Sequence, residues 1–260
     1  MSGSASLRSG SLWPNGIRGA VSITFDDGLA SQLEIAVPVL EKHGLRGTFY
    51  LCAGTASMGR LEPWKVVARR GHELGNHTAS HPCPENVLFD PHPNVKALED
   101  MTVSDYEADL LEAARGIVVL APEQKATSFA YPCYQSFVGR GTGRASVVPV
   151  VARHCVAGRG PGEVPIANDP ARSDLAHLWS WPCERKNGAE LIGLVEHAVS
   201  GGRWAILTFH GVHEGHLPIG ENDLAELCAH LEARRAEVWT APVEEIARHL
   251  AAARGASARS

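Results

Sequence analysis

Short apolar stretches alternate along this chain with longer segments whose apolar residues recur at helical spacing. Residues 21–25 alternate apolar and polar side chains, include β-branched residues, and stop at an Asp-Asp-Gly turn. That pattern predicts a β-strand followed by a turn. Residues 31–43 carry apolar side chains along one helical face and end at Gly44, which predicts a helix with a glycine after its last turn.

The same rhythm continues towards the C-terminal end. Further strands are predicted over residues 47–53, 73–76, 128–131, 150–156, 179–181, 204–209 and 237–240. Helices are predicted over residues 61–70, 104–120, 188–200, 224–235 and 242–253, and loops over 82–100 and 134–148. Regular alternation of strand and helix predicts a parallel sheet covered by helices. At this length we expect a closed or nearly closed (β/α) barrel in preference to an open sheet.

Polar residues of chemical interest come where the predicted strands end. Asp26 and Asp27 follow the first strand, His77 follows the third, and His210 follows the most apolar one. In a parallel barrel the carboxyl ends of the strands share one rim, and active sites form there. The sequence therefore predicts that these four side chains lie together.

Composition and charge exclude some partners. The chain has 260 residues, a formal net charge of -5, 44% hydrophobic and 20% charged residues, which is the profile of an ordinary globular protein. A slightly acidic chain without a basic run is not expected to bind nucleic acid. We also expect no membrane span, because no stretch of about 18 consecutive apolar residues occurs.

Domain boundaries and location follow from the two ends of the chain. The first 16 residues are rich in serine and glycine and have no apolar core of a signal peptide. We expect a flexible segment over residues 1–18, a single catalytic domain over 19–253, and a flexible tail over 254–260. Cytoplasmic location is the expectation, with secretion as the alternative if a signal has been removed.

Six cysteines are scattered through the sequence without any C-x-x-C spacing. Such spacing does not predict a zinc knuckle. We expect free thiols in a reducing compartment, with disulfides as the alternative. Three of the cysteines directly follow a proline, namely Cys83, Cys133 and Cys183.

Two imidazoles and a carboxylate form a candidate metal site. His77 and His81 are four positions apart, so on a helical turn they would share one face and could reach a single ion. Asp27 could complete the set, although Asp-Gly is also ordinary turn chemistry. Three ligands with open positions are the form of a catalytic metal site. Asp26 and His210 would then be available to take and give a proton.

Three segments together resemble the signature motifs of the polysaccharide deacetylases, the NodB-homology proteins of carbohydrate esterase family four. These segments are Thr24–Gly28, His77–Pro82 and Leu207–His210, and the resemblance runs from about Val21 to Leu250. It implies a distorted (β/α)7-type barrel of the NodB-homology fold. It also implies metal-dependent removal of N-acetyl groups from amino sugars, or of O-acetyl groups from xylan.

The resemblance also implies a role for each motif residue. Asp27, His77 and His81 would bind a divalent metal, with zinc the first choice and cobalt, nickel, manganese or iron as alternatives. Asp26 would be the general base and His210 the general acid. The nucleophile would be a water molecule bound to the metal.

The third motif departs from the family pattern. Residues 129–134 have the sequence Phe-Ala-Tyr-Pro-Cys-Tyr, and Ala130 stands where many members have an arginine that orients the base. The resemblance implies that the backbone N–H of Cys133 faces the oxyanion, because a backbone donor survives a change of side chain. Tyr134 beside it is a candidate for substrate contact.

The fourth motif, usually an Asp and a Trp that line the acetyl pocket, is poorly matched. Asp174, Trp179 and Trp181 are candidates, and Trp181 is taken as the substrate-binding residue. The partner of His210 stays unassigned. His213 and His216 near it are expected to be solvated loop residues.

Three other functions are weighed against deacetylation. One is a related C–N hydrolase acting on a linear or cyclic amide that is not a sugar, so that the partner is a carbohydrate or a small amide. Another is a carbohydrate-binding protein without turnover, which the intact Asp26 and His210 disfavour. The last is an iron oxygenase with two histidines and one carboxylate, whose motif order differs from the one found here. The oligomeric state is left open.

Overall fold

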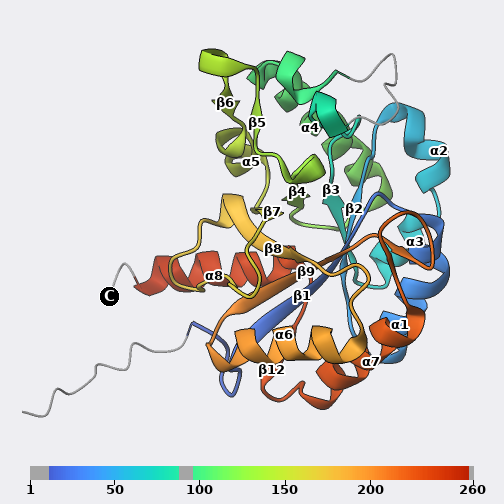
Figure 1. Ribbon diagram of the computed structural model, residues 1–260, viewed down its shortest axis with the longest axis vertical. Helices are drawn as coiled ribbons and strands as arrows, with labels where there is room; N and C mark the ends of the chain where they lie inside the picture. Colours follow the sequence, from blue (N-terminus) through green and yellow to red (C-terminus); the bar gives the residue numbers. More distant parts are fainter. Residues whose placement is uncertain (1–11, 88–95, 258–260) are drawn as a thin grey trace, which may run out of the picture.

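A closed barrel of parallel strands forms the centre of the molecule (Figure 1). The computed structural model describes residues 12–87 and 96–257. The strand order is β12-β1-β2-β3-β4-β7-β8-β9, and β9 pairs back onto β1, so that seven strands close the ring and β12 flanks it. This confirms the predicted fold class. The strands are β1 (Gly19–Asp26), β2 (Thr48–Leu51), β3 (Glu73–Asn76), β4 (Ser128–Ala130), β7 (Ala157–Pro161), β8 (Leu178–Pro182), β9 (Trp204–Phe209) and β12 (Val238–Thr240).

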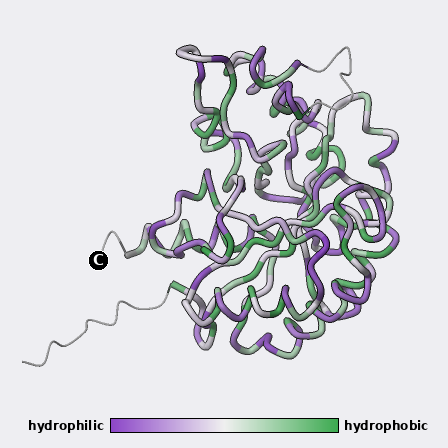
Figure 2. Tube along the Cα trace, viewed as in Figure 1, coloured by the Kyte–Doolittle hydropathy of each residue, from purple (hydrophilic) through white to green (hydrophobic). Residues whose placement is uncertain are grey.

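Helices cover the outside of this barrel. They are α1 (Val37–Lys42), α2 (Met58–Leu61), α3 (Trp64–Arg69), α4 (Val103–Leu120), α5 (Val148–His154), α6 (Gly188–Ser200), α7 (Glu221–Ala233) and α8 (Val243–Ser257). Hydrophobic and hydrophilic residues alternate along α6 and α7, as expected for helices with one buried face (Figure 2). Among the described helices none is long and apolar enough to cross a membrane.

Two short pairs of strands complete the rim, one antiparallel and one parallel. They are β5 (Phe137–Val138) with β6 (Ala145–Ser146), which run antiparallel, and β10 (Gly211–Val212) with β11 (Pro218–Ile219). A π-helical turn, η1 (Gln32–Ala36), leads into α1. Figure 1 shows α4, α5 and the β5–β6 pair on one side of the barrel, and α6 and α7 on the other.

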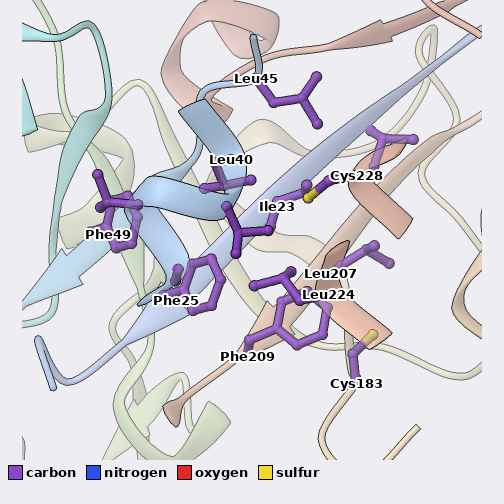
Figure 3. Packing of buried hydrophobic residues seen from close by; sticks show 14 of the residues in the cluster. Ile23, Phe25, Leu40, Leu45, Phe49, Cys183, Leu207, Phe209, Leu224 and Cys228 are labelled. Atoms are coloured by element: carbon purple, nitrogen blue, oxygen red, sulfur yellow. The ribbon is translucent and has the colours of Figure 1, made fainter. Parts of the chain in front are cut away.

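The alternation in β1 separates the two sides of the barrel wall. Ile23 and Phe25 are fully buried and pack with residues of α1 and α7, such as Leu40 and Leu224 (Figure 3). Successive side chains of a strand point to opposite faces, so the polar residues between them face the barrel interior. Those residues are Ser22, Thr24 and Asp26, and all three are buried. The strand thus brings a carboxylate to the interior rim.

A buried carboxylate also links neighbouring strands at the end of the barrel where β2, β3 and β4 begin. Glu73 on β3 accepts hydrogen bonds from the Thr48 hydroxyl (2.8 Å), the Ser128 backbone N–H (2.7 Å) and the Glu244 backbone N–H (3.0 Å). Burial raises the pKa of Glu73, while the bonds from Glu244 and Ser128 act to lower it. The contacts join three strands to the first turn of α8, whose unpaired N–H groups favour a carboxylate.

One predicted strand is wrong and its neighbour was missed. Residues 150–156 were expected to be a strand, but α5 occupies 148–154, and β7 begins at Ala157. Pro149 fits the first turn of a helix, where no backbone N–H is needed. Two glycines hide the strand in the sequence, and one of them is required: a Cβ at Gly158 would lie 2.6 Å from the Ala176 carbonyl oxygen.

Residues near both ends of the described chain pack onto the barrel or continue its helices. Trp13, inside the segment expected to be flexible over 1–18, is only 6% exposed and donates its indole N–H to the Gly202 carbonyl. Residues 1–11 and 258–260 lie outside the described part of the chain. Helix α8 continues through residues 254–257 of the expected tail. In α4 Thr102 and Asp105 form a capping box at the start of the helix.

Burial of His72 should make the fold sensitive to mild acid. The Gly47 N–H donates to its Nδ1 (3.1 Å), which fixes a neutral ring. Burial, assisted by Arg46 and Arg70, lowers the pKa of His72 to about 3. The unfolded chain, with a histidine pKa of about 6.5, takes up a proton first, so stability is present above that pH and falls below it.

We therefore expect His72 to remove about 2 kcal/mol of unfolding free energy between pH 7 and pH 5. Urea unfolding of the protein and of His72→Asn at both pH values measures this. The pH-dependent loss should be smaller in the variant by that amount. His197→Asn, on the exposed face of α6, should behave like the unchanged protein. Equal losses in His72→Asn and the unchanged protein would refute the assignment.

Candidate functional site

Strand register brings Asp26 and His210 together. Phe25 on β1 pairs with Phe209 on β9, so the next residue of each strand emerges at the same rim. The Gln32 side chain from the π-helical turn donates to the backbone carbonyl of Asp26 and to that of His210 (3.0 Å). The two hydrogen bonds of this amide link the end of β1 to the end of β9. Nothing in the local sequence pattern singled out Gln32, because its partners are distant backbone atoms.

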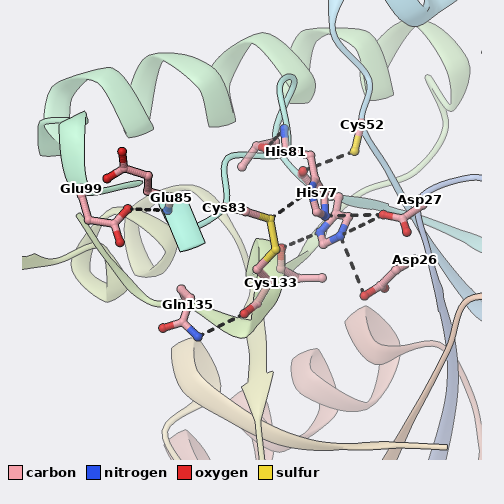
Figure 4. The surroundings of a disulfide bond; sticks show 12 residues. Asp26, Asp27, Cys52, His77, His81, Cys83, Glu85, Glu99, Cys133 and Gln135 are labelled. Carbon is pink, nitrogen blue, oxygen red and sulfur yellow. Dashed lines mark hydrogen bonds and ion pairs between the residues drawn. A yellow bond between two sulfur atoms is a disulfide. The ribbon is translucent and has the colours of Figure 1, made fainter. Parts of the chain in front are cut away.

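Three side chains converge on one point beside this pair (Figure 4). The Asp27 carboxylate oxygen Oδ1 lies 3.6 Å from His77 Nε2 and 3.5 Å from His81 Nε2. These distances are too long for good hydrogen bonds, which end near about 3.2 Å. Two ligand atoms held about 2.1 Å from one ion at the tetrahedral angle are about 3.4 Å apart. The spacing therefore fits a triangle of metal ligands better than a hydrogen-bonded cluster.

Unusual backbone conformations concentrate in the loops that carry these groups. Left-handed φ values occur at Asp27 (76°), Thr78 (61°), His81 (53°), Cys133 (49°) and Tyr134 (59°). Non-glycine residues seldom adopt this region, and such strain clusters at functional sites. The His77–His81 segment is accordingly a tight loop after β3 and not a turn of helix. Asp109 on α4 holds this loop by accepting hydrogen bonds from the Ser80 hydroxyl (2.9 Å) and backbone N–H (3.1 Å).

His77 is oriented through its second ring nitrogen. Its Nδ1 donates to the Ala130 carbonyl oxygen at 2.8 Å, which leaves Nε2 with a lone pair directed towards Asp27. Burial is the main cause that lowers the pKa of His77 to about 4, with opposing contributions from Asp26 and Asp27. The ring is therefore neutral at neutral pH, which is the form that binds metals.

A buried ion pair fixes Asp26. The Arg159 guanidinium on β7 donates through Nη2 to Asp26 Oδ1, and neither side chain reaches solvent to any extent, at 0% and 5% exposure. Burial acts to raise the pKa of Asp26, but Arg159, then His77 and His210, outweigh it and lower the pKa to about 2. The carboxylate is thus ionised at neutral pH.

Arg159 is the arginine that the sequence appeared to lack. Ala130 on β4 and Arg159 on β7 are register partners, so the guanidinium enters the barrel from the strand next to the expected one. Its Cζ also lies 4.8 Å from the centre of the Tyr50 ring. The available signal was a charged residue inside a short Gly-Arg-Gly segment. The misplaced strand prediction over residues 150–156 concealed it.

Glu184, just past the end of β8, faces His210. Its Oε1 lies 4.0 Å from His210 Nδ1, and both side chains are nearly buried, at 13% and 14% exposure. That Nδ1 atom is buried and makes no hydrogen bond to the described residues. One water molecule or a small rotation would close the gap. Tyr134 lies beside the same ion pair, since the centre of its ring is 6.0 Å from Arg159 Cζ, and burial raises its pKa.

The fourth-motif candidates do not reach this site. Trp181 is 1% exposed, belongs to the hydrophobic core and donates its indole N–H to the Ile166 carbonyl (3.0 Å), which corrects its prediction as a substrate-binding residue. Trp179, two residues earlier on the same outward face of β8, is exposed at 37%. Asp174 caps a 3-10 turn by accepting from the Ala176 N–H. The strand alternation of β8 explains these positions, because only its inward-facing residues approach the rim.

A disulfide between Cys83 and Cys133 corrects the expectation of free thiols at those positions. The two cysteines follow prolines in the loops after β3 and β4, which are neighbouring strands, and their Cα atoms are 5.6 Å apart. The remaining cysteines, Cys52, Cys155, Cys183 and Cys228, are free. Sequence spacing could not pair residues that are 50 positions apart.

Comparison with known proteins agrees with this fold. Residues 15–136 match the family model described as polysaccharide deacetylase. A peptidoglycan-N-acetylglucosamine deacetylase of Bacillus cereus is 38% identical over 77 residues, which are 28% of this chain and 27% of that protein. The chain spans between 5% and 28% of the length of the curated relatives it matches.

Solved structures share the fold. A candidate polysaccharide deacetylase from Mycobacterium smegmatis superposes with a TM-score of 0.65 and 18% identity, covering 92% of both chains. A family 4 acetyl xylan esterase from Clostridium thermocellum, in complex with a cobalt ion, has a TM-score of 0.53 and 17% identity, covering 87% of this chain and 89% of that one.

The fold and the arrangement at its rim define a seven-stranded parallel barrel with an Asp-His-His cluster. The chain is similar to polysaccharide deacetylases, in sequence over residues 15–136 and in fold over 92% of its length.

We expect the Arg159–Asp26 pair to hold the strands β7 and β1 together. Removing one partner leaves an uncompensated buried charge, so Arg159→Met and Asp26→Asn should each cost about 3–5 kcal/mol of unfolding free energy. The double variant should lose less than the sum of the two, by about 1–3 kcal/mol. Chemical denaturation of all four proteins measures the coupling.

The matched control is the exposed pair of Arg203 and Asp169, whose side chains are 41% and 28% exposed. Arg203→Met and Asp169→Asn should change stability by no more than about 1 kcal/mol each. Strict additivity of the Arg159 and Asp26 substitutions would show that the pair does not interact as described.

Proposed function

We propose that this protein is a metal-dependent hydrolase that removes acetyl groups from a carbohydrate, N-acetyl groups first and O-acetyl groups as the alternative. One observation carries the proposal. The triangle of Asp27, His77 and His81, spaced as ligands, lies directly beside a carboxylate that a buried arginine keeps ionised. The similarity to polysaccharide deacetylases supports the reaction class.

The residues present fit a divalent ion. His77 is neutral, buried and oriented, Asp27 adds one negative charge, and its side chain and that of His81 are about one-third exposed, at 34% and 31%. Nitrogen and oxygen ligands in this number suit zinc first, and cobalt, nickel, manganese or iron as alternatives. When bound, such an ion polarises a carbonyl group and makes a water molecule more acidic.

Asp26 has the properties of the general base. It is ionised before any substrate arrives, because Arg159 holds its charge, and its Oδ2 is 3.8 Å from His77 Nε2 at the edge of the ligand triangle. The guanidinium occupies Oδ1, which leaves the other oxygen for a proton from water. Arg159 is therefore a positioning residue in this proposal.

His210 is the proposed general acid, and Glu184 its orienting partner. A carboxylate that accepts from Nδ1–H fixes the ring and directs the other nitrogen towards a departing amine or alcohol. The left-handed turn at Cys133 and Tyr134 borders the same space. We propose that its backbone N–H groups face the oxyanion.

The carbohydrate substrate is preferred over a small cyclic amide. An arginine beside the base and a carboxylate beside His210 are the partners that the third and fourth motifs leave unassigned in this sequence. Arg159 and Glu184 are the candidates for these two places. The named activities of the relatives, on peptidoglycan N-acetylglucosamine and on acetyl xylan, give the substrate classes to try.

Acetate release tests the proposed function. Chitin oligomers, peptidoglycan fragments, acetylxylan and a cyclic imide should be offered with and without a chelator. We expect acetate from at least one carbohydrate, loss of release with chelator, and recovery on adding zinc or cobalt. Hydrolysis of the imide alone would indicate instead a C–N hydrolase that acts on a linear or cyclic amide other than a sugar.

Asp26→Asn should lower kcat by about 10²–10⁴-fold, because a general base contributes that much, while the metal content of the protein stays unchanged. Elemental analysis alongside the rate assay distinguishes loss of the general base from loss of the metal. Asp174→Asn, at the exposed cap of a 3-10 turn, is the matched control and should keep full activity. Full activity of Asp26→Asn would remove this residue from the mechanism.

Glu184→Gln should lower kcat about tenfold and leave KM and metal content close to their original values, because an orienting contact acts in the transition state. Glu221→Gln, at the exposed first turn of α7, serves as the control. A pure loss of stability without the kinetic change would mark Glu184 as structural.

A further inference from the structure

The His81 ring presents its two nitrogens to two different groups of side chains (Figure 4). Its Nε2 lies 3.5 Å from Asp27 Oδ1, in the ligand triangle described above. Its Nδ1 lies 3.6 Å from the Cys83 sulfur, which is bonded to Cys133. The ligand atoms of His81, Cys83 and Cys133 all lie within 4.8 Å of one another.

The spacing of this second group fits a metal ion. A zinc ion binds thiolate sulfur at about 2.3 Å and imidazole nitrogen at about 2.05 Å, which places the two atoms about 3.6 Å apart at the tetrahedral angle. The His81–Cys83 distance of 3.6 Å agrees with that value. In the disulfide neither sulfur carries the negative charge that makes a thiolate a metal ligand.

We propose that reduction of the Cys83–Cys133 disulfide creates a second metal site, made of the two thiolates and His81 Nδ1. A dithiol or phosphine reductant breaks the sulfur–sulfur bond, adds two electrons and two protons, and is itself oxidised. Binding of a soft or borderline divalent ion then forms two sulfur–metal bonds and releases the two protons to solvent. Zinc and cobalt are the ions suited to a sulfur and imidazole set.

The two sites cannot be filled independently. A neutral imidazole has one lone pair, so His81 can bind an ion through Nδ1 or through Nε2 but not through both. Filling the thiolate site withdraws one ligand from Asp27 and His77. The redox state of the disulfide would thus decide where the ion is held, and the site opens in a reducing compartment such as the cytoplasm.

Reductant can reach the disulfide. Cys133 is partly exposed, and the His81 side chain is 31% exposed at the rim. Cys83 is 6% exposed beneath it. The loops that carry the two cysteines are joined to different strands, so the sulfur atoms can separate after reduction without breaking the barrel.

Cobalt titration of the whole chain tests the proposal without any substrate. The protein is reduced with a phosphine, freed of reductant under anaerobic conditions, and titrated with Co²⁺. Thiol counting should rise from four free cysteines to six. The reduced protein should then show an intense sulfur-to-cobalt charge-transfer band in the near ultraviolet, and the oxidised protein should show none.

Variants assign the band to its ligands. Cys83→Ser and Cys133→Ser should each weaken it strongly, and the double variant should abolish it. Cys52→Ser is the matched control, because the Cys52 thiol lies 3.7 Å from the His77 carbonyl oxygen and is outside the cluster. Asp27→Asn should retain the band while losing the proposed deacetylase site.

Two outcomes overturn the proposal. One is the absence of the band in reduced protein whose thiol count has reached six. The other is a band that survives in the Cys83→Ser, Cys133→Ser double variant. Neither depends on acetate release, so failure of the proposed function and failure of this second site are distinguishable.

Discussion

The buried pair of Arg159 and Asp26 is the interaction on which the site depends. Two charges inside a barrel are costly to desolvate, and the cost is offset only when each charge has a partner in good geometry. Here the guanidinium also lies over the Tyr50 ring. Burial acts to raise the pKa of Asp26, and the guanidinium lowers it. Asp26 therefore stays ionised although it is almost fully buried.

That constraint explains the polar interior of the barrel. Small hydroxyl side chains line it instead of the bulky aliphatic layers of many parallel barrels. Thr208 donates to Ser180 (3.1 Å), Ser180 donates to the Gly160 carbonyl (2.8 Å), and Thr24 donates to the Leu207 carbonyl (2.8 Å). Small residues leave room for the Arg159 side chain, while the apolar halves of the same strands pack against the helices. The outer face of the barrel wall therefore packs against the helices, and the inner face carries the polar groups of the site.

Loops at the rim add the second level of positioning. Left-handed residues, the Asp109 carboxylate and the Cys83–Cys133 disulfide hold the His77–His81 loop against the loop after β4. Such strained conformations persist only where surrounding contacts over-determine them. The ligand triangle is therefore preformed, which lowers the cost of assembling it around an ion or substrate.

The sequence by itself determined the class of fold, most of the strand ends and the cluster of Asp26, Asp27, His77, His81 and His210. Periodicity is a local property, and the register of β1 with β9 made Asp26 and His210 neighbours as soon as both were placed at strand ends. Motif spacing brought Asp27, His77 and His81 to one rim. Only the tertiary structure decided the partners: Arg159 beside Ala130, Glu184 beside His210, Gln32 across two strands, and Cys83 with Cys133. Each of these contacts joins distant segments through strand register or loop packing. No pattern of neighbouring residues records such contacts, because their energy exists only once the barrel has closed.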